Sequence, residues 1–185
     1  MTDTGFGPTA LATPANYVTI ARLLVSPLLL VAITSTGPSW AVLAVWTTLC
    51  LTDGVDGWLA RRHGTTRSGA FLDPLADKVL VLGALFALVA IERFWIVPAV
   101  IIGVREVAIS MYRSYWARRG LSIPARRIAK LKTVTQQLAV GFALVPLAAN
   151  PDWLADGLLW AAVALTVVTG LQYLYDGSRA ADRTV

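Results

Sequence analysis

Hydrophobic residues fill most of this chain in long runs that charged residues seldom interrupt. The longest stretches without a charged residue extend over 23–52, 133–151 and 157–175. A helix that crosses a bilayer needs about 17 to 25 mainly apolar residues, so these runs are long enough for membrane-spanning helices. Strands are not expected, because the open edge of a sheet cannot satisfy its backbone groups in lipid.

Short polar segments divide the apolar sequence. Turn signals occur in "STGPSW" at 35–40, "ERFW" at 92–95 and "NPDW" at 150–153. They predict an all-α, polytopic membrane protein with six transmembrane helices, at 17–36, 39–61, 71–91, 94–116, 131–149 and 154–175. No internal repeat or linker is evident, so we expect a single membrane domain over residues 1–185.

Charge predicts the orientation of these helices. The chain is 56% hydrophobic and 15% charged, and twelve of its 16 basic residues follow the second span, surround the connection after the fourth span or lie in the tail. Arg93 alone lies in an opposite loop. Positively charged loops stay on the cytoplasmic side, so both termini and these connections should be cytoplasmic in a plasma-membrane protein. The net charge of +5 is a topology signal, and nucleic acid is not an expected partner.

Four carboxylates interrupt the apolar pattern. Asp53 and Asp56 are three residues apart, and Asp73 and Asp77 are four apart, so each pair lines one face of its own helix. The connection between these helices is short, so the two faces can meet near the cytoplasmic side. Converging carboxylates repel one another unless cations neutralise them, and hard oxygen ligands favour Mg²⁺ or Mn²⁺.

Small residues continue the acidic face. Gly57 and Ala60 lie four and seven residues after Asp53, and Gly69 lies one turn before Asp73. Such spacing is typical of close helix packing, but beside carboxylates it also indicates the wall of a nucleotide pocket. Arg61, a turn beyond Gly57, can reach a phosphate.

These residues form a motif that resembles the signature of the CDP-alcohol phosphatidyltransferases. It reads Asp53-x-x-Asp56-Gly57-x-x-Ala60-Arg61, seven further residues, then Gly69-x-x-x-Asp73-x-x-x-Asp77. The motif fixes eight positions over 25 residues, and members of the family have six transmembrane helices. The resemblance also implies a homodimer.

The resemblance implies a role for each of these residues. Asp53, Asp56 and Asp73 bind two divalent cations, Mg²⁺ or Mn²⁺, and Asp77 completes the site and acts as general base. Gly57, Ala60 and Gly69 border the cytidine, and Arg61 holds the pyrophosphate. An alcohol then attacks the lipid-linked phosphorus of a CDP-lipid, and CMP leaves.

The acceptor alcohol is indicated by two further segments. "FLDPLADK" and "IAKLKTVTQQ" look most like the branch of the family that makes phosphatidylglycerophosphate from CDP-diacylglycerol and glycerol 3-phosphate. An anionic acceptor needs cationic contacts, for which Arg105, Arg118, Lys130 and Lys132 are candidates. Arg105 lies inside the fourth span, and its neighbour Glu106 is not expected to share its helix face.

Family members often begin with an interfacial helical segment. Here "PANYVTIARLLVSP" holds Asn16, Thr19 and Arg22 on one helix face, which predicts a short N-terminal helix along the cytoplasmic surface before Pro27 turns the chain inward. Two alternatives explain the same residues. Thr13 or Asn16 could cap the helix, and Arg22 could extend its charged end to the membrane surface.

Other functions are compatible with the same pattern. Within the family, phosphatidylglycerol or inositol phosphate could replace the acceptor, as in a cardiolipin synthase or a phosphatidylinositol phosphate synthase. A divalent-cation transporter would also place Asp residues inside spans. A transport path should carry polar residues at depth in several spans, whereas the acids here gather at one end, which favours the enzyme.

Overall fold

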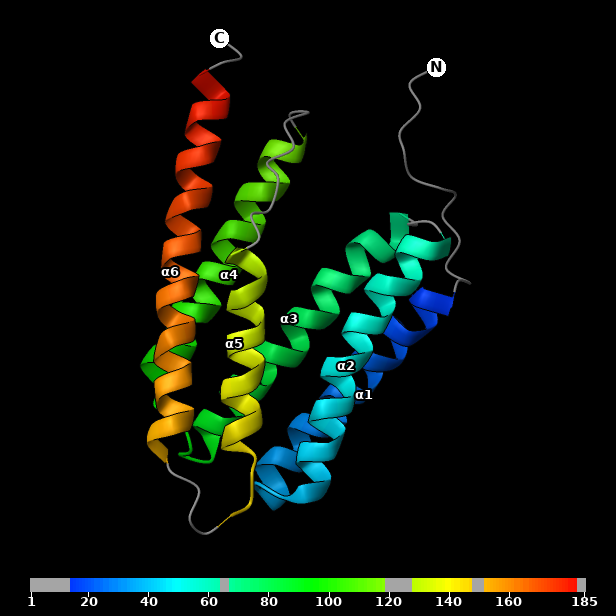
Figure 1. Cartoon of the computed structure of the whole chain (residues 1–185), viewed down its shortest axis with the longest axis vertical. Helices are drawn as coiled ribbons and strands as arrows, with labels where there is room; N and C mark the ends of the chain where they lie inside the picture. The colour runs from blue at the N-terminus through cyan, green and yellow to red at the C-terminus, as the bar shows by residue number, and fades with distance from the viewer. Residues whose placement is uncertain (1–13, 64–66, 119–127, 148–151, 183–185) are drawn as a thin grey trace.

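Six helices make up the structure, a computed structural model that describes residues 14–63, 67–118, 128–147 and 152–182 (Figure 1). They are α1 (Pro14–Thr36), α2 (Trp40–His63), α3 (Arg67–Ala90), α4 (Ile96–Arg118), α5 (Ile128–Ala143) and α6 (Asp152–Asp182). Within these ranges, the side chains of residues 14–15, 53–63, 67–71, 118, 128–130, 152 and 178–182 lie outside the description. No strand occurs in the described ranges, which confirms the all-α class.

The turn between α1 and α2 forms where "STGPSW" predicts it. Gly37 has a φ of 70°, and its amide donates to the Ile33 carbonyl at 3.1 Å, so it ends α1 in the left-handed conformation that glycine adopts without strain. Ser39 then caps the start of α2, because its hydroxyl accepts a hydrogen bond from the Val42 amide at 3.3 Å.

The end of α5 differs from the prediction. The fifth span was expected to reach residue 149, but the helix ends at Ala143. Pro146 explains the earlier end, because the residue before a proline is pushed out of the helical conformation. The Leu144 amide still donates to the Val140 carbonyl at 3.0 Å, so the last turn closes before the chain leaves the helix.

The predicted N-terminal interfacial segment is not separate from the first span. Residues 14–36 form one continuous helix with Pro27 inside it, which corrects the expectation that Pro27 turns the chain. A proline inside a helix removes one amide donor, and its ring crowds the carbonyl of the preceding turn. The helix nevertheless continues through this position, and next to the proline the Ser26 hydroxyl donates to the Arg22 carbonyl at 2.7 Å.

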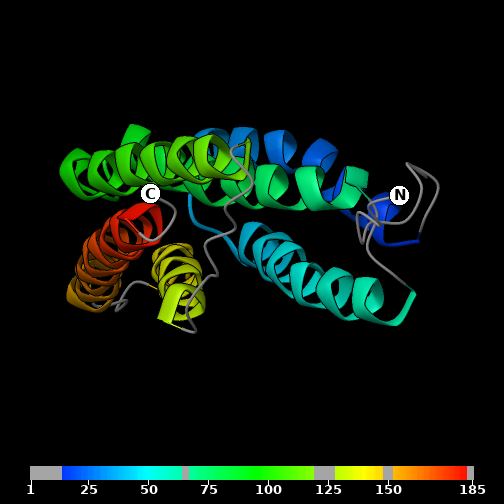
Figure 2. The ribbon, with the colours of Figure 1, turned by 90° about the horizontal axis from the view of Figure 1, so that it is seen from above.

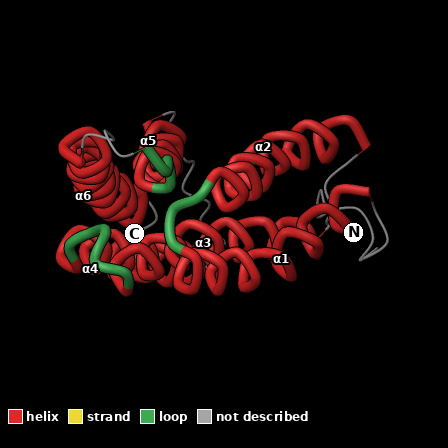
Figure 3. Tube along the Cα trace, turned by 90° about the horizontal axis from the view of Figure 1, so that it is seen from below, coloured by secondary structure: helices red, strands yellow, loops and turns green. Residues whose placement is uncertain are grey.

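The helices lie in two layers of three. Seen along the long axis, α1, α3 and α4 form one layer and α2, α5 and α6 the other (Figures 2 and 3). Within the layers, α1 packs on α3, α3 on α4, α2 on α5 and α5 on α6, while α1–α2, α4–α6 and α3–α5 contacts join the layers. The face of α3 that carries the acids thus has neighbours on α1 and α5.

Polarity changes along the bundle. The half that contains the α1–α2, α3–α4 and α5–α6 connections is filled by buried apolar residues, among them Ile33, Leu88, Ile102, Val140 and Leu159. The other half contains the buried polar residues. These are Asn16, Thr19, Arg22, Ser26, Lys132, Gln136, Thr166 and Thr169. Asp73 of α3 lies in this half, because it is hydrogen-bonded to Thr19.

The outer surface of the bundle is largely apolar. Leu24 and Leu28 on α1 are each 68% exposed, and Trp40, Trp95 and Trp153 are also exposed at the apolar end of the bundle. By length and composition, Asn16–Thr36 and Trp153–Gly177 could cross a membrane, and Trp40–Thr52 is a shorter apolar segment. Exposed apolar surface of this extent is unfavourable in water and suits lipid.

Candidate functional site

The four acids lie at matching distances along α2 and α3 from the short connection between these helices. Asp53 and Asp56 belong to α2, which ends at His63, and Asp73 and Asp77 belong to α3, which begins at Arg67. Asp53 lies ten residues before the end of α2, and Asp77 lies ten residues after the start of α3. At 1.5 Å of rise per residue, Asp53 and Asp77 are therefore equally far along their helices from the short connection at 64–66.

Six residues of the predicted metal and nucleotide site are described only by their backbone. Five of them, Asp53, Asp56, Gly57, Ala60 and Arg61, are helical residues of α2, and Gly69 is a helical residue of α3. Their side chains lie outside the described part of the chain, so the predicted metal and nucleotide contacts of these residues stay predictions.

Asp73 is held by a residue from α1. The Thr19 hydroxyl donates to Oδ1 of Asp73 at 2.7 Å, while Asp73 itself is half-buried. This hydrogen bond joins residues 54 positions apart in the sequence. Asn16, Thr19 and Arg22 are each only 1% exposed. The prediction that they lie along the cytoplasmic surface is therefore wrong for Thr19, whose hydroxyl binds Asp73 inside the bundle.

Asp77 lies one turn further along α3 and faces a different neighbour. It is half-buried, and its charge interacts with that of Lys132 on α5. Lys132 also forms an ion pair with Oε1 of Glu106 on α4. The predicted general base and one predicted acceptor-binding cation are thus brought together from α3 and α5.

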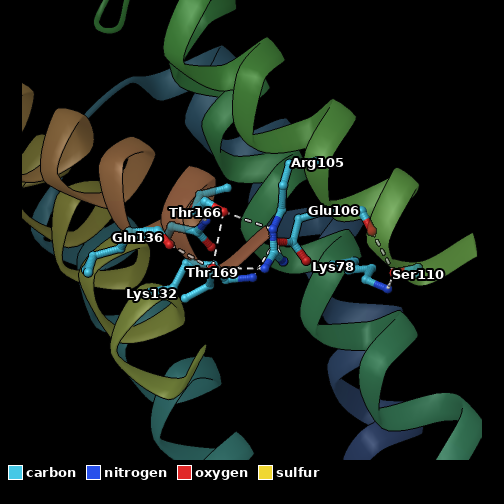
Figure 4. Close-up of polar contacts among 9 residues, drawn as sticks. Lys78, Arg105, Glu106, Ser110, Lys132, Gln136, Thr166 and Thr169 are labelled. Carbon is cyan, nitrogen blue, oxygen red and sulfur yellow. Dashed lines mark hydrogen bonds and ion pairs between the residues drawn. The ribbon is translucent and has the colours of Figure 1, made fainter. Parts of the chain in front are cut away.

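Arg105 belongs to the same polar cluster (Figure 4). Its Nε donates to the Thr166 carbonyl at 3.1 Å and its Nη2 to the Thr169 hydroxyl at 2.9 Å. Gln136 completes the link between α5 and α6, because its side-chain amide donates to the Thr166 hydroxyl at 3.2 Å. The cluster therefore connects α4, α5 and α6 in the polar half of the bundle.

Arg105 and Glu106 form an ion pair, although neighbouring helix residues were not expected to share a face. Nη1 of Arg105 lies 3.0 Å from Oε1 of Glu106. Neighbouring residues on a helix start in different directions, but the long, flexible arginine side chain curves back to the carboxylate. Arg105 is thus an ion-paired residue, and its role in acceptor binding stays a prediction.

A polar pocket of about 380 Å³ between α3 and α4 was not predicted from the sequence. Lys78 donates to the Ser110 hydroxyl, which in turn donates to the Glu106 carbonyl at 2.6 Å. Arg113 also lines the pocket, and its guanidinium carbon lies 5.9 Å from the centre of the Tyr173 ring. The sequence signal for Arg113 is its position two helical turns after Arg105.

The remaining basic candidates lie near the same end of the bundle. Arg118 is the last residue of α4, and Lys130 is the third residue of α5. The side chains of both lie outside the described residues. Their backbone positions place them at the end of the bundle that carries the acids.

An apolar cleft of about 270 Å³ opens between α2 and α5. Trp46 and Gly141 line it, and the Trp46 indole donates to the Gln137 carbonyl at 3.3 Å across the two helices. Cys50 also lines the cleft and precedes Asp53 by three residues. The cleft therefore ends about one helical turn from the first predicted metal ligand.

The residues of the site fit a hard divalent cation by their chemistry. Carboxylate oxygens on two antiparallel helices are the ligands that Mg²⁺ and Mn²⁺ prefer, and Asp73 is already oriented by a hydrogen bond. Among the side chains that the structure describes, no three His, Cys, Asp or Glu residues lie close enough to hold a metal. Asp53 and Asp56 lie outside that set.

Comparison with known proteins agrees with the motif. The model of the family described as CDP-alcohol phosphatidyltransferase matches residues 12–168. The chain is 37% identical over 179 residues to a probable phosphatidylglycerophosphate synthase of Mycobacterium tuberculosis, covering 91% of this chain and 83% of that protein.

Two further similarities extend this result. A CDP-diacylglycerol–glycerol-3-phosphate 3-phosphatidyltransferase of Sodalis glossinidius is 39% identical over 173 residues, which cover 86% of this chain and 92% of that one. The crystal structure of Mycobacterium tuberculosis phosphatidylinositol phosphate synthase with CDP-DAG bound has a TM-score of 0.69 at 21% identity, covering 90% of this chain and 87% of the other. At that identity, the structural similarity shows the fold.

Proposed function

The chain belongs to the CDP-alcohol phosphatidyltransferase family, and we propose that it transfers the phosphatidyl group of CDP-diacylglycerol to glycerol 3-phosphate. The products are phosphatidylglycerophosphate and CMP. The observation that carries this proposal is the place of Asp77 on α3, where its charge interacts with that of Lys132 and where it lies as many residues from the connection between α2 and α3 as Asp53 does. A proton acceptor and a cation for an anionic substrate thus share one site.

The carboxylates provide the binding site for two divalent cations, Mg²⁺ or Mn²⁺, in this proposal. Asp53, Asp56, Asp73 and Asp77 hold them from two helices. Bound divalent cations neutralise the pyrophosphate and stabilise the attacking and departing oxygens of a phosphoryl transfer. Gly57, Ala60 and Gly69 leave room for the cytidine, and Arg61 binds the pyrophosphate through its guanidinium.

The reaction then needs a base and an oriented alcohol. Asp77 accepts the proton of the acceptor hydroxyl as the oxygen forms its bond to the lipid-linked phosphorus. The bond from that phosphorus to the CMP oxygen breaks, and CMP leaves with the electron pair. One carboxylate oxygen of Asp77 holds the released proton.

Basic residues bind the phosphate of the acceptor. Lys132 has three donors, of which its ion pair with Glu106 uses one, so it can also contact an anionic substrate. Arg105, Arg118 and Lys130 complete the predicted set. Lys78 and Arg113 line the adjacent pocket and add two cations to this set.

The lipid part of the donor needs an apolar surface beside the site. The cleft between α2 and α5 is lined by Leu43, Leu138 and Phe142 and reaches Cys50 near Asp53. We assign one acyl chain of CDP-diacylglycerol to this cleft. The enzyme is an integral membrane protein with six spans in this proposal, and its site and both termini face the cytoplasm.

The test is CMP release by purified protein in detergent micelles containing CDP-diacylglycerol. Glycerol 3-phosphate, phosphatidylglycerol and inositol phosphate are added one at a time, with Mg²⁺ or Mn²⁺ and with a chelator. The expected result is release that needs both the metal and glycerol 3-phosphate. Asp156→Asn is a matched control, because Asp156 lies near the start of α6 at the opposite end of the bundle.

Each outcome has a defined meaning. CMP release with inositol phosphate or phosphatidylglycerol but not with glycerol 3-phosphate would support the transferase reaction and reject the proposed acceptor. Folded protein that releases no CMP with any acceptor would contradict the proposed reaction.

A further inference from the structure

The buried face of α1 carries polar side chains that the proposed reaction does not use. Asn16, Thr19, Arg22 and Ser26 are each at most 1% exposed, although the outward face of the same helix is apolar. A buried polar group is costly unless it has a partner. Polar residues inside a spanning helix therefore indicate a contact with a specific function.

Thr19 makes such a contact across two helices. Its hydroxyl donates to Oδ1 of Asp73 at 2.7 Å, within the normal range for a hydrogen bond to a carboxylate. A threonine in a helix has few χ1 choices, so the direction of this donor is well defined. The bond occupies one acceptor position of Oδ1 and restricts the rotation of the carboxylate.

The spacing of α1 and α3 is fixed by close packing further along the same pair. A Cβ at Gly83 of α3 would lie 2.5 Å from Cδ1 of Leu30 on α1, so the glycine allows the two helices to approach closely. This close packing of α1 on α3 keeps the helix turn that carries Thr19 beside the turn that carries Asp73.

We propose that Thr19 is a positioning residue for the divalent-cation site, which orients the Asp73 carboxylate toward the cation through its hydroxyl. The inference rests on the proposed function, in which Asp73 is a metal ligand. Partners that orient a metal ligand typically change metal affinity by about 10- to 100-fold when they are removed. The first helix therefore contributes to a metal site whose ligands all come from α2 and α3.

Metal binding can be measured without catalysis. We would follow the loss of the free Mn²⁺ signal by electron paramagnetic resonance as purified protein in detergent is titrated, with no substrate present. The variants are Thr19→Val, which keeps the shape and removes the hydroxyl, Thr19→Ser, which restores the hydroxyl, and Asp73→Asn. Thr34→Val is the control on α1, because the Thr34 hydroxyl donates only to the Leu30 and Val31 carbonyls of its own helix among the described contacts.

The expected result is a rise in the Mn²⁺ dissociation constant of about 10- to 100-fold for Thr19→Val. Thr19→Ser and Thr34→Val should stay close to the unmodified protein. Thr19→Ala serves as a second variant without the hydroxyl if Thr19→Val does not give folded protein.

The outcomes separate this inference from the proposed function. If Asp73→Asn loses Mn²⁺ while Thr19→Val and Thr19→Ala bind it normally, the positioning role is wrong and the metal site stands. If Thr19→Ser binds as weakly as Thr19→Val, packing and not the hydroxyl is responsible, and the inference fails. Unchanged Mn²⁺ binding by Asp73→Asn would reject the metal-ligand assignment on which both rest.

Discussion

Asp73 and Asp77 are chemically identical, but residues from different helices surround them and suit them to different roles. They are one helical turn apart on α3, yet Asp73 accepts a hydrogen bond from Thr19 of α1 and Asp77 lies near Lys132 of α5. A hydrogen-bonded, oriented carboxylate suits metal coordination. A carboxylate beside the acceptor cation suits proton transfer from the acceptor hydroxyl.

Asp77→Asn tests the role of the base. The amide keeps the size of the side chain but cannot accept a proton at neutral pH, so binding of CDP-diacylglycerol should remain while CMP release falls by about 100-fold or more. Binding is measured by equilibrium titration and turnover by CMP release. Turnover at the unmodified rate would remove Asp77 from this role.

Arg105→Ala tests whether this residue contacts the acceptor. We expect a larger rise in the KM for glycerol 3-phosphate than in the KM for CDP-diacylglycerol, because a cation near an anionic acceptor is lost. Thr169→Val is the matched comparison, since it removes the partner of Nη2 and keeps the charge. Equal effects on both KM values would indicate a structural role for Arg105 instead.

At the level of helices, small residues determine how closely α4 and α6 approach. Gly170 faces Arg105, and a Cβ there would lie 3.3 Å from the Arg105 Nε. Gly177 faces the ring of Tyr112, where a Cβ would lie 2.8 Å from both Cε1 and Cζ and in contact with the hydroxyl. The close approach lets Arg105 reach the Thr166 carbonyl.

Gly177→Ala should therefore lower stability. A rigid aromatic ring cannot move aside as a flexible side chain can, and overpacking of this kind typically costs about 1–3 kcal/mol. The measurement is the midpoint of thermal unfolding in detergent. Gly157→Ala is the control on the same helix, because nothing lies within 4 Å of the added Cβ, and alanine favours the helix over glycine.

A midpoint for Gly177→Ala at or above that of Gly157→Ala would contradict this account of α4–α6 packing. The comparison also bears on the site, because a shift of α6 would move Thr166 and Thr169 away from Arg105.

At the level of the whole molecule, one half of the bundle is apolar and the other polar. The described apolar half is closed by fully buried side chains such as Ile102, Val140 and Leu159. A cation path across the bundle would need polar groups there, so this packing argues against the transporter hypothesis. A site open at one end suits an enzyme that takes a lipid and a water-soluble acceptor. The homodimer stays a prediction.

The proposed orientation can be tested by labelling in intact cells with a membrane-impermeant maleimide, after Cys50→Ser removes the single native cysteine. Trp153→Cys replaces an exposed residue at the apolar end of the bundle and should be labelled from outside. Thr184→Cys, in the tail, should be labelled only after the membrane is permeabilised. The reverse pattern would invert the topology that the basic residues predict.

The sequence alone predicted the elements of this fold well. Gly37 and Ser39 form the first turn as expected, and the acids fall on α2 and α3, because helix periodicity and turn chemistry act over a few residues. The predicted end of the fifth span was wrong because the apolar run continues past Pro146. The N-terminal segment was misjudged because its polar face meets α3 and not the membrane surface.

What the sequence by itself determined is the set of helices, the polar end of the bundle and the motif that identifies the family. These depend on hydrophobicity, capping and spacing, which are local along the chain. Only the tertiary structure decided which side chains meet. The bonds from Thr19 to Asp73, from Lys132 to Glu106 and from Arg105 to Thr166 join residues 54, 26 and 61 positions apart. Such contacts depend on how helix faces pack, because many pairings of six apolar helices satisfy the same sequence pattern.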